Sequence, residues 1–194
     1  MMIGQTSRVL VLDGHPDGTS LCSALAAAAA ETAQARGAEV RLLQLSAMEF
    51  DSNLAHGYKQ RMEHEPDLQA FLEAVRWCDT FILVHPLWWG AAPAKLKGLI
   101  DRVFLPGIAF AYEGDGHFPK KLFEGRTARV LITADTPPWY LRFGYRNGWL
   151  NVLRRQILDF VGLKVTHMKV VGTIRDAAPA RIAEFMATAR KLAG

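Results

Sequence analysis

Hydrophobic positions along the chain follow two alternating patterns, which predict strands and helices in turn. Short apolar runs, typical of strands buried in a sheet, lie at residues 9–12, 40–45, 81–84, 128–133 and 165–171. Between and after these runs, apolar residues recur three and four positions apart, as in amphipathic helices. The predicted helices span about residues 20–36, 66–77, 93–104, 150–161 and 179–190.

Strands that alternate with helices predict a parallel sheet with helices on both faces. Thr19 or Ser20 can cap the first helix, and Gly37 and Gly162 can end helices. Five strands favour the flavodoxin-like order 2-1-3-4-5, an α/β three-layer sandwich. Residues 46–65 are expected to be irregular, and residues 105–125 to form a long loop or partial hairpin.

Composition supports one folded domain over residues 1–194, because 50% of the residues are hydrophobic and 22% are charged. The net charge of +4 comes without a run of like charges, which argues against nucleic-acid binding but allows a local patch for a phosphorylated cofactor. Cys22 and Cys78 form no CxxC motif; a disulfide stays open, but a reduced cytoplasmic setting is simpler. The N-terminus lacks a signal-peptide core, and Ala26–Ala30 is too short for a membrane span.

The first unusual loop follows the first strand, at residues 14–22. Free N–H groups and the helix dipole at a helix N-terminus favour a phosphate. The Thr19 and Ser20 hydroxyls and the His15 side chain could donate hydrogen bonds to it, although ordinary helix capping also explains the hydroxyls. The loop has neither GxGxxG nor GxxxxGK[ST], so the dinucleotide-fingerprint and P-loop interpretations fail.

The second loop, at residues 85–90, follows the third strand and reads His-Pro-Leu-Trp-Trp-Gly. Ligands of open α/β sheets bind outside the carboxyl ends of the strands, so flat side chains at this place indicate a flat ligand. Pro86 stiffens the loop and Gly90 allows close backbone approach. The alternative is that Trp88 and Trp89 fill the core or an interface.

The third loop follows the fourth strand, at residues 133–140. Its small residues would let backbone amides approach a ligand, while Asp135 could instead be a turn residue or a helix cap. In the predicted strand order, all three loops lie at the same edge of the sheet.

Other chemistries find little support. The six histidines show neither HxxxH nor HExxH spacing, so no metal site is predicted. No GxSxG motif is present, which disfavours an esterase. Cys22, in a first helical turn, could have a lowered thiol pKa, but packing of a small residue is the preferred interpretation.

With these loops, the chain resembles the flavodoxin-like NAD(P)H:quinone oxidoreductases, a group that includes DT-diaphorase and smaller bacterial NAD(P)H oxidoreductases that bind FMN or FAD. The resemblance covers about residues 8–190. Its most specific part is Pro86–Gly90 and the continuation through residues 93–104. The loop around His15 is similar to the family's phosphate loop, and residues 110–112 and 133–140 are similar to the bacterial branch.

By position, the resemblance implies three groups of flavin-binding residues. The phosphate would be held by His15, Thr19, Ser20, Leu21 and Cys22. The isoalloxazine ring would be lined, and its N5/O4 edge bonded, by Pro86, Leu87, Trp88, Trp89 and Gly90. The pyrimidine edge would bond to Thr133, Ala134, Asp135 and Thr136, where amides can stabilise the charge of reduced flavin. Trp89 and Tyr140 are the candidate catalytic residues.

Three departures from the family pattern stand out. Cys22 lies where relatives often have asparagine, and Asp135-Thr136 replaces the double glycine of DT-diaphorase. Tyr140 could match the tyrosine of that enzyme's Tyr–His pair, but residues 145–147, Tyr-Arg-Asn, stand about where its histidine would be. The resemblance therefore supplies no proton-relay histidine.

The expected function is a flavin-dependent NAD(P)H oxidoreductase that reduces quinones or similar acceptors by ping-pong hydride transfer. FMN is favoured because the chain is short, although FAD could be held by residues 46–65 and a dimer partner. Arg142, Arg146 or Lys120–Lys121 could attract the phosphate of NADPH. The resemblance implies a homodimer, and the many aromatic residues in loops support one.

Two other functions remain open. The chain could be a flavin-bound regulatory subunit, of the kind that accompanies potassium-efflux systems. It could also be an azoreductase or nitroreductase on the same fold. An electron carrier of the flavodoxin kind is disfavoured by the basic charge balance.

Overall fold

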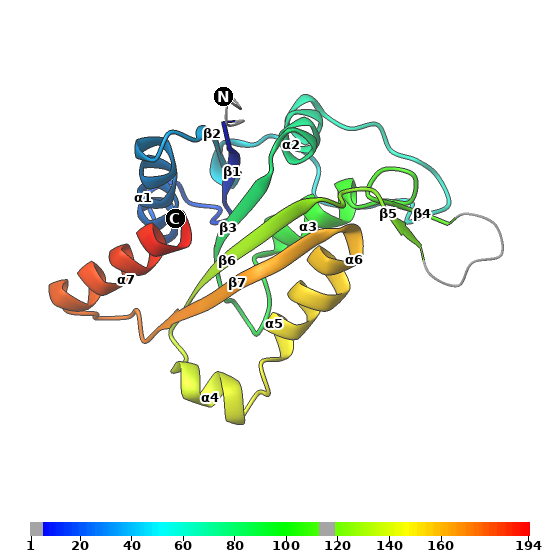
Figure 1. Cartoon of the computed structure of the whole chain (residues 1–194). Coiled ribbons are helices and arrows are strands. Elements are labelled where there is room, and N and C mark those ends of the chain that lie inside the picture. Colours follow the sequence, from blue (N-terminus) through cyan, green and yellow to red (C-terminus); the bar gives the residue numbers. More distant parts are fainter. Residues whose placement is uncertain (1–5, 113–118) are drawn as a thin grey trace.

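The computed structural model describes residues 6–112 and 119–194, which form a three-layer α/β sandwich (Figure 1). The strands of the central sheet are β1 (Arg8–Asp13), β2 (Glu39–Gln44), β3 (Thr80–Pro86), β6 (Arg126–Ala134) and β7 (Leu163–Gly172). They pair in parallel in the order β2-β1-β3-β6-β7. Renumbered within this sheet, the order is 2-1-3-4-5, so the predicted flavodoxin-like fold is confirmed.

Helices cover both faces of the sheet (Figure 1). One face carries α1 (Leu21–Ala35) and α7 (Pro179–Leu192). The other carries α2 (Pro66–Trp77), α3 (Ala94–Val103) and a helical run made of α5 (Gly148–Asn151), η2 (Val152–Leu158) and α6 (Asp159–Val161). Strand side chains alternate between two apolar cores: Val11 faces the α1 side, and Leu12 faces the α2 side.

The predicted helix signals are used as expected at three places. Of the two candidate caps, Ser20 accepts a hydrogen bond from Ser23 N and begins α1. The chain leaves α1 through Gly37, where φ is +86°, and leaves α6 through Gly162, where φ is +102°. A Cβ at Gly162 would lie 2.6 Å from Glu124 N, so space as well as backbone conformation requires glycine there.

Two regions differ from the sequence-based expectation. Residues 138–143 form a short helix, α4 (Pro138–Phe143), where a loop was predicted. Pro138 occupies the first turn, where its missing N–H has no intrahelical partner to lose, so the rigid Pro-Pro pair begins a helix. The predicted helix at 150–161 exists, but its middle, Val152–Leu158, is π-helical, and nothing in the local sequence explains this.

The segment at 105–125 contains the short antiparallel strands β4 (Phe110–Ala111) and β5 (Lys120–Lys121), as a partial hairpin would. Residues 113–118, which include most of the glycine-rich part of that prediction, lie outside the described residues.

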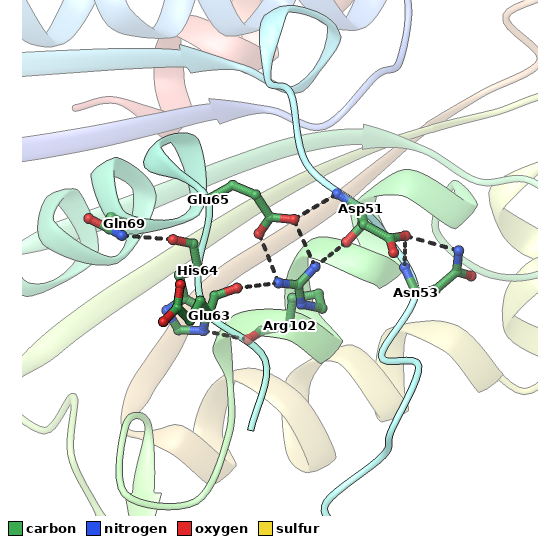
Figure 2. Close-up of polar contacts among 7 residues, drawn as sticks. All are labelled: Asp51, Asn53, Glu63, His64, Glu65, Gln69 and Arg102. Carbon is green, nitrogen blue, oxygen red and sulfur yellow. Dashed lines mark hydrogen bonds and ion pairs between the residues drawn. The ribbon is translucent and has the colours of Figure 1, made fainter. Parts of the chain in front are cut away.

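One buried arginine fastens the irregular residues 46–65 to α3; only η1 (Leu45–Ala47) at their start is helical. Arg102 is 1% exposed, and its guanidinium donates to Asp51 O, to Glu63 O at 2.8 Å and to Glu65 Oε2 at 2.8 Å (Figure 2). His64 Nε2 lies 2.9 Å from Arg102 O. Both ends of the segment 51–65 are therefore held at one point, which closes it into a compact loop.

Candidate functional site

The three loops singled out in the sequence meet at the carboxyl edge of the sheet, because β1, β3 and β6 are neighbours. The His15 ring packs edge-to-face against Trp88, with centroids 5.3 Å apart. Leu87 N donates to Thr133 O at 2.7 Å, and Cys22 Sγ lies 3.2 Å from Thr133 Oγ1. Direct contacts thus join the first loop to the second, and the second to the third.

Hydroxyl groups of the first loop are bonded within the loop itself. Asp17 accepts from Thr19 N at 2.9 Å and from Thr19 Oγ1 at 2.8 Å, and these bonds lower the pKa of the Asp17 carboxyl. The Ser20 hydroxyl caps α1. Among the described residues, nothing accepts a hydrogen bond from the N–H groups of Leu21 and Cys22. The donors left for an anion are therefore the backbone amides of the helix start rather than the two hydroxyls.

A buried carboxylate shapes this loop from below. Asp13, at the end of β1, is fully buried and accepts from His15 N at 3.1 Å and from Ser23 Oγ at 2.6 Å. His15 Nδ1 in turn accepts from Asp17 N at 2.9 Å. His15 is thus fixed by its backbone and by one ring nitrogen, and Nε2 remains as its free polar atom within the described structure.

The Cys22 thiol is packed rather than reactive. Its side chain is 1% exposed, and burial raises its pKa to about 12. The thiol is therefore neutral near pH 7, so packing of a small residue is the correct interpretation and a lowered pKa is wrong. Any contact of Cys22 with an anion would be made by its backbone.

The second loop turns sharply at the tandem tryptophans. Trp88 and Ala91 exchange two backbone hydrogen bonds of 2.9 Å, and the two residues between them, Trp89 and Gly90, have φ values of +49° and +74°. Glycine adopts this conformation freely, but a tryptophan is strained there by about 1–3 kcal/mol. The turn holds the Trp89 side chain fully in solvent and leaves the N–H groups of Trp89 and Gly90 without a partner in the described structure.

The other residues of the second loop are bound up in the protein. Pro86 is buried and has no N–H, and the N–H groups of Leu87 and Trp88 bond to Thr133 O and Ala91 O. Of the five residues predicted to meet a ring edge through the backbone, only Trp89 and Gly90 retain unbonded N–H groups within residues 6–112 and 119–194.

In the third loop, Asp135 has a partner that the sequence did not reveal. Its carboxylate accepts from Arg175 N and from Arg175 Nη2, both at 3.0 Å. Thr133 and Ala134 are 1% and 2% exposed and belong to the end of β6. Of the four residues predicted to meet the pyrimidine edge, Asp135 and Thr136 have N–H groups that lack a partner among the described residues.

A cavity of about 500 Å³ lies between the second and third loops and the segment from α4 to α5. Predicted residues that line it are Leu87, Trp89, Gly90 and Thr136. Tyr145 and Asn147, which were noted only because they stand near the place of the missing histidine, also line the cavity, and so does Trp149, which had no expected role in the site. None of the described residues in its lining is charged at neutral pH.

Tyr140, the candidate proton-relay tyrosine, is not among the residues that line the cavity. Its ring packs edge-to-face against Tyr145, with centroids 5.0 Å apart, and Tyr145 faces the cavity. A role for Tyr140 at the site would therefore act through Tyr145.

His85 lies at the end of β3, fully buried. Its Nδ1 is 2.8 Å from Pro86 O, and Trp149 Nε1 donates to its Nε2 at 3.5 Å. Burial lowers the pKa of His85 to about 4, so the ring is neutral near pH 7. A neutral ring fits both contacts, with a proton on Nδ1 and a lone pair on Nε2.

Backbone strain gathers at this end of the molecule. The non-glycine residues with positive φ in the described structure are Trp89, Arg146, Asn147, Thr173 and Asp176. Each lies in a segment that follows the carboxyl end of β3, β6 or β7. Strain of this kind persists where the surroundings hold it in place, and it is frequent at binding sites.

Other site types find no support within the described residues. They contain no group of three or more His, Cys, Asp or Glu side chains placed to hold a metal ion. None of their helices has the length and apolar character needed to cross a bilayer. Cys22 and Cys78 are both free and buried.

Residues 7–193 match the sequence pattern of a protein family with a flavodoxin-like fold. This chain belongs to that family. It is 31% identical over 165 residues to the uncharacterized NAD(P)H oxidoreductase YcaK of Escherichia coli, covering 82% of this chain and 81% of that protein. It is 33% identical over 94 residues to an FMN-dependent NADH:quinone oxidoreductase of Cereibacter sphaeroides, covering 48% of this chain and 45% of that protein.

Among solved structures, the NAD(P)H:quinone oxidoreductase of Methanothermobacter marburgensis superposes with a TM-score of 0.82 at 25% identity. The alignment covers 97% of this chain and 98% of that protein. The similarity thus extends over nearly the whole length of both chains.

Proposed function

We propose that this member of the flavodoxin-like family is a flavin-dependent NAD(P)H oxidoreductase, with FMN as its cofactor and a quinone or similar ring compound as its acceptor. The observation that carries the proposal is the donor set at the carboxyl edge. Three pairs of backbone N–H groups, at residues 21–22, 89–90 and 135–136, have no partner in the described structure, and an uncharged aromatic cavity lies beside the last two pairs.

This donor set fits a flavin mononucleotide. The start of α1 offers amides and a helix dipole to the phosphate. The amides of Trp89 and Gly90 suit the N5/O4 edge of the ring, and those of Asp135 and Thr136 suit its pyrimidine edge. A flavin held by these residues would supply the capacity for hydride transfer from NAD(P)H to the acceptor.

The residues of this chain would then bind, orient and tune. Amides at the pyrimidine edge stabilise negative charge, and they act strongly in a site from which water is excluded. Trp89 and Trp149 supply flat walls, which hold planar rings in stacked or edge-to-face contact. Tyr145 and Asn147 are the polar side chains that could bond the acceptor, and Tyr140 remains a candidate behind Tyr145.

We further propose that the protein is a cytoplasmic homodimer. Each chain would form a single flavin-binding domain over residues 1–194. The short helix α4, next to the cavity in the chain but outside its lining for these two residues, exposes aromatic side chains, with Trp139 at 64% and Phe143 at 70%. A second subunit would cover such a surface. Arg142 and Arg146 stand on the same segment and form no ion pair within the described residues, so they could attract the phosphate of NADPH.

A regulatory subunit with bound flavin would need the same donor set, so turnover separates the two functions. An azoreductase or nitroreductase would also share it. The uncharged lining favours neutral acceptors over acceptors that carry sulfonate or carboxylate groups, because a buried charge without a partner is costly.

The decisive experiment is the absorbance spectrum of the purified protein, followed by titration with FMN, FAD and riboflavin. We expect flavin absorbance and tighter binding of FMN than of riboflavin, which lacks the phosphate. Anaerobic assays with NADPH and a neutral quinone should show turnover. A colourless protein that binds neither FMN nor FAD would rule out the proposal, and flavin binding without turnover would favour the regulatory function.

A further inference from the structure

The segment from Pro137 to Trp149, which carries α4 and one wall of the cavity, has few anchors in the core. Most of its side chains face solvent, including Phe143 and Tyr145, which are 70% and 61% exposed. Leu141 is its only side chain counted in the buried core, at 5% exposed, and Trp149 is half-buried. The position of the wall therefore depends on very few contacts.

Trp149 contacts a fully buried residue of the central sheet. His85 sits on β3, between β1 and β6, and is fully buried. The imidazole ring is fixed from the other side because Nδ1 lies 2.8 Å from Pro86 O. A Cβ on Gly14 would lie 3.0 Å from His85 Cβ, so the first loop also packs closely against this residue.

We propose that His85 is a positioning residue: its Nε2 accepts the indole N–H of Trp149 and thereby fixes the segment 137–149, and with it the cavity wall, to the central strand. The effect on ligand binding rests on the proposed function. The effect on the segment itself does not, because it concerns contacts within the chain.

The pair combines a long hydrogen bond of 3.5 Å with ring packing. Nε2 of a buried neutral imidazole is an acceptor, and Trp149 is its only hydrogen-bond partner within the described residues. An apolar side chain at position 85 would accept no hydrogen bond. The planes of the two rings are perpendicular, at 90°, and their centroids lie 6.1 Å apart. The rings therefore meet edge-to-face and are not stacked.

The first test needs no cofactor. Arg142 and Arg146 lie in the segment and are exposed, so trypsin can report how often the segment leaves the body of the protein. In flavin-free protein, we expect His85→Phe to speed cleavage at these two arginines about five- to tenfold, the scale of one lost hydrogen bond. His85→Gln, whose side-chain oxygen can replace Nε2 as acceptor, should stay within about twofold of the wild type.

A double-mutant cycle identifies the partner. Trp149→Phe removes the donor and keeps an aromatic ring, so the double variant His85→Phe/Trp149→Phe should be cleaved no faster than the faster single variant. If the increases in cleavage rate of the two single variants multiply in the double variant, the two residues act independently and the proposal is overturned. Equal cleavage in wild type and His85→Phe would also overturn it. Cleavage sites are assigned by mass spectrometry, and rates are compared well below each unfolding midpoint, so a loss of global stability is not mistaken for local release.

The second test uses FMN titration. We expect His85→Phe to weaken FMN binding severalfold and His85→Gln to restore it. If the wild type binds no flavin, the proposed function fails, but the proteolysis result still decides the role of His85. If the wild type binds FMN and all variants bind it equally, the effect of His85 on ligand binding is refuted and the proposed function stands.

Discussion

Polar groups are treated differently in two regions of the molecule. The first is the cluster of Arg102 with Asp51, Glu63 and Glu65, called here the Arg102 junction, and the second is the carboxyl edge of the sheet. At the junction, the buried guanidinium of Arg102 donates through both terminal nitrogens to the Glu65 carboxylate and to the carbonyls of Asp51 and Glu63, and only its Nε lacks a partner among the described residues (Figure 2). At the edge, backbone N–H groups stay unbonded, Trp89 is strained, and aromatic side chains face solvent.

The difference separates parts that hold the fold from parts that await a ligand. A polar cluster whose partners all come from the chain has no use for another molecule. A set of oriented donors without partners, beside an aromatic cavity, is completed only by one.

The largest effect is expected at the junction. Arg102→Met removes the cation, leaves the Glu65 carboxylate and two carbonyls short of a donor, and should lower the free energy of unfolding by about 3–5 kcal/mol. Urea unfolding measures it. Lys97→Met, which breaks an exposed ion pair with Asp101 on the same helix, is the matched control and should change stability by less than about 1 kcal/mol. Similar effects of both variants would show that Arg102 is not the fastening point.

The next effect concerns His85 and pH. The pKa of His85 is about 4 in the folded protein, compared with an ordinary value of 6.5, which we take for the unfolded chain. Between pH 4 and pH 6.5, the unfolded chain therefore binds a proton at His85 that the folded chain does not. This contribution is complete above pH 6.5 and is lost as the pH falls towards 4, by about 2–3 kcal/mol.

His85→Phe should remove that part of the pH dependence. Free energies of unfolding near pH 7 and near pH 4.5 give the measurement, and the difference between variant and wild type cancels groups common to both. If the wild type and the variant lose the same free energy of unfolding between pH 7 and pH 4.5, His85 is not held neutral in the folded protein.

A third effect separates binding from stability at the edge. Trp89→Ala should weaken flavin or acceptor binding by about 1–3 kcal/mol, the scale of one lost aromatic contact. Stability should not fall, because the Trp89 side chain is fully exposed and its backbone is strained. Trp139→Ala, an exposed tryptophan outside the cavity lining, is the control for binding. Unchanged affinity and turnover in Trp89→Ala would leave it without a role at the site.

The smallest effect is expected at Asp135. Its ion pair with Arg175 is exposed, so Asp135→Asn should change the free energy of unfolding by less than about 1 kcal/mol. Because the proposed ligand contact is made by the backbone amide, FMN affinity should change by less than about threefold. A large loss of affinity would instead assign the carboxylate itself to the site.

Local sequence signals predicted the sandwich well because each signal acts over a few residues. Apolar runs gave the five sheet strands, and Gly37 and Gly162 marked helix ends at which φ is positive. The three loops were found because a strand end, a helix start and unusual side chains coincide in the sequence. The helix at Pro138–Phe143 was missed because a proline pair is equally compatible with a loop and with a first helical turn.

The candidate site was predicted only in outline. Which hydroxyls remain free depends on Asp17 and Ser23, and which carboxylate remains free depends on Arg175, forty residues from Asp135 in the chain. Tyr145, Asn147 and Trp149 reach the cavity only because the segment after β6 folds back over the sheet edge. No spacing rule links them to Trp89.

The sequence by itself determined the five sheet strands, the five longer helices that follow them and the position of the three loops, since hydrophobic periodicity is a local property. Tertiary structure alone decided which polar groups are consumed within the protein and which are left for a ligand. That division follows from contacts between residues far apart in the chain, such as His85 with Trp149 and Glu65 with Arg102. Such pairs leave no local pattern, because each residue meets its partner only when the sheet has formed.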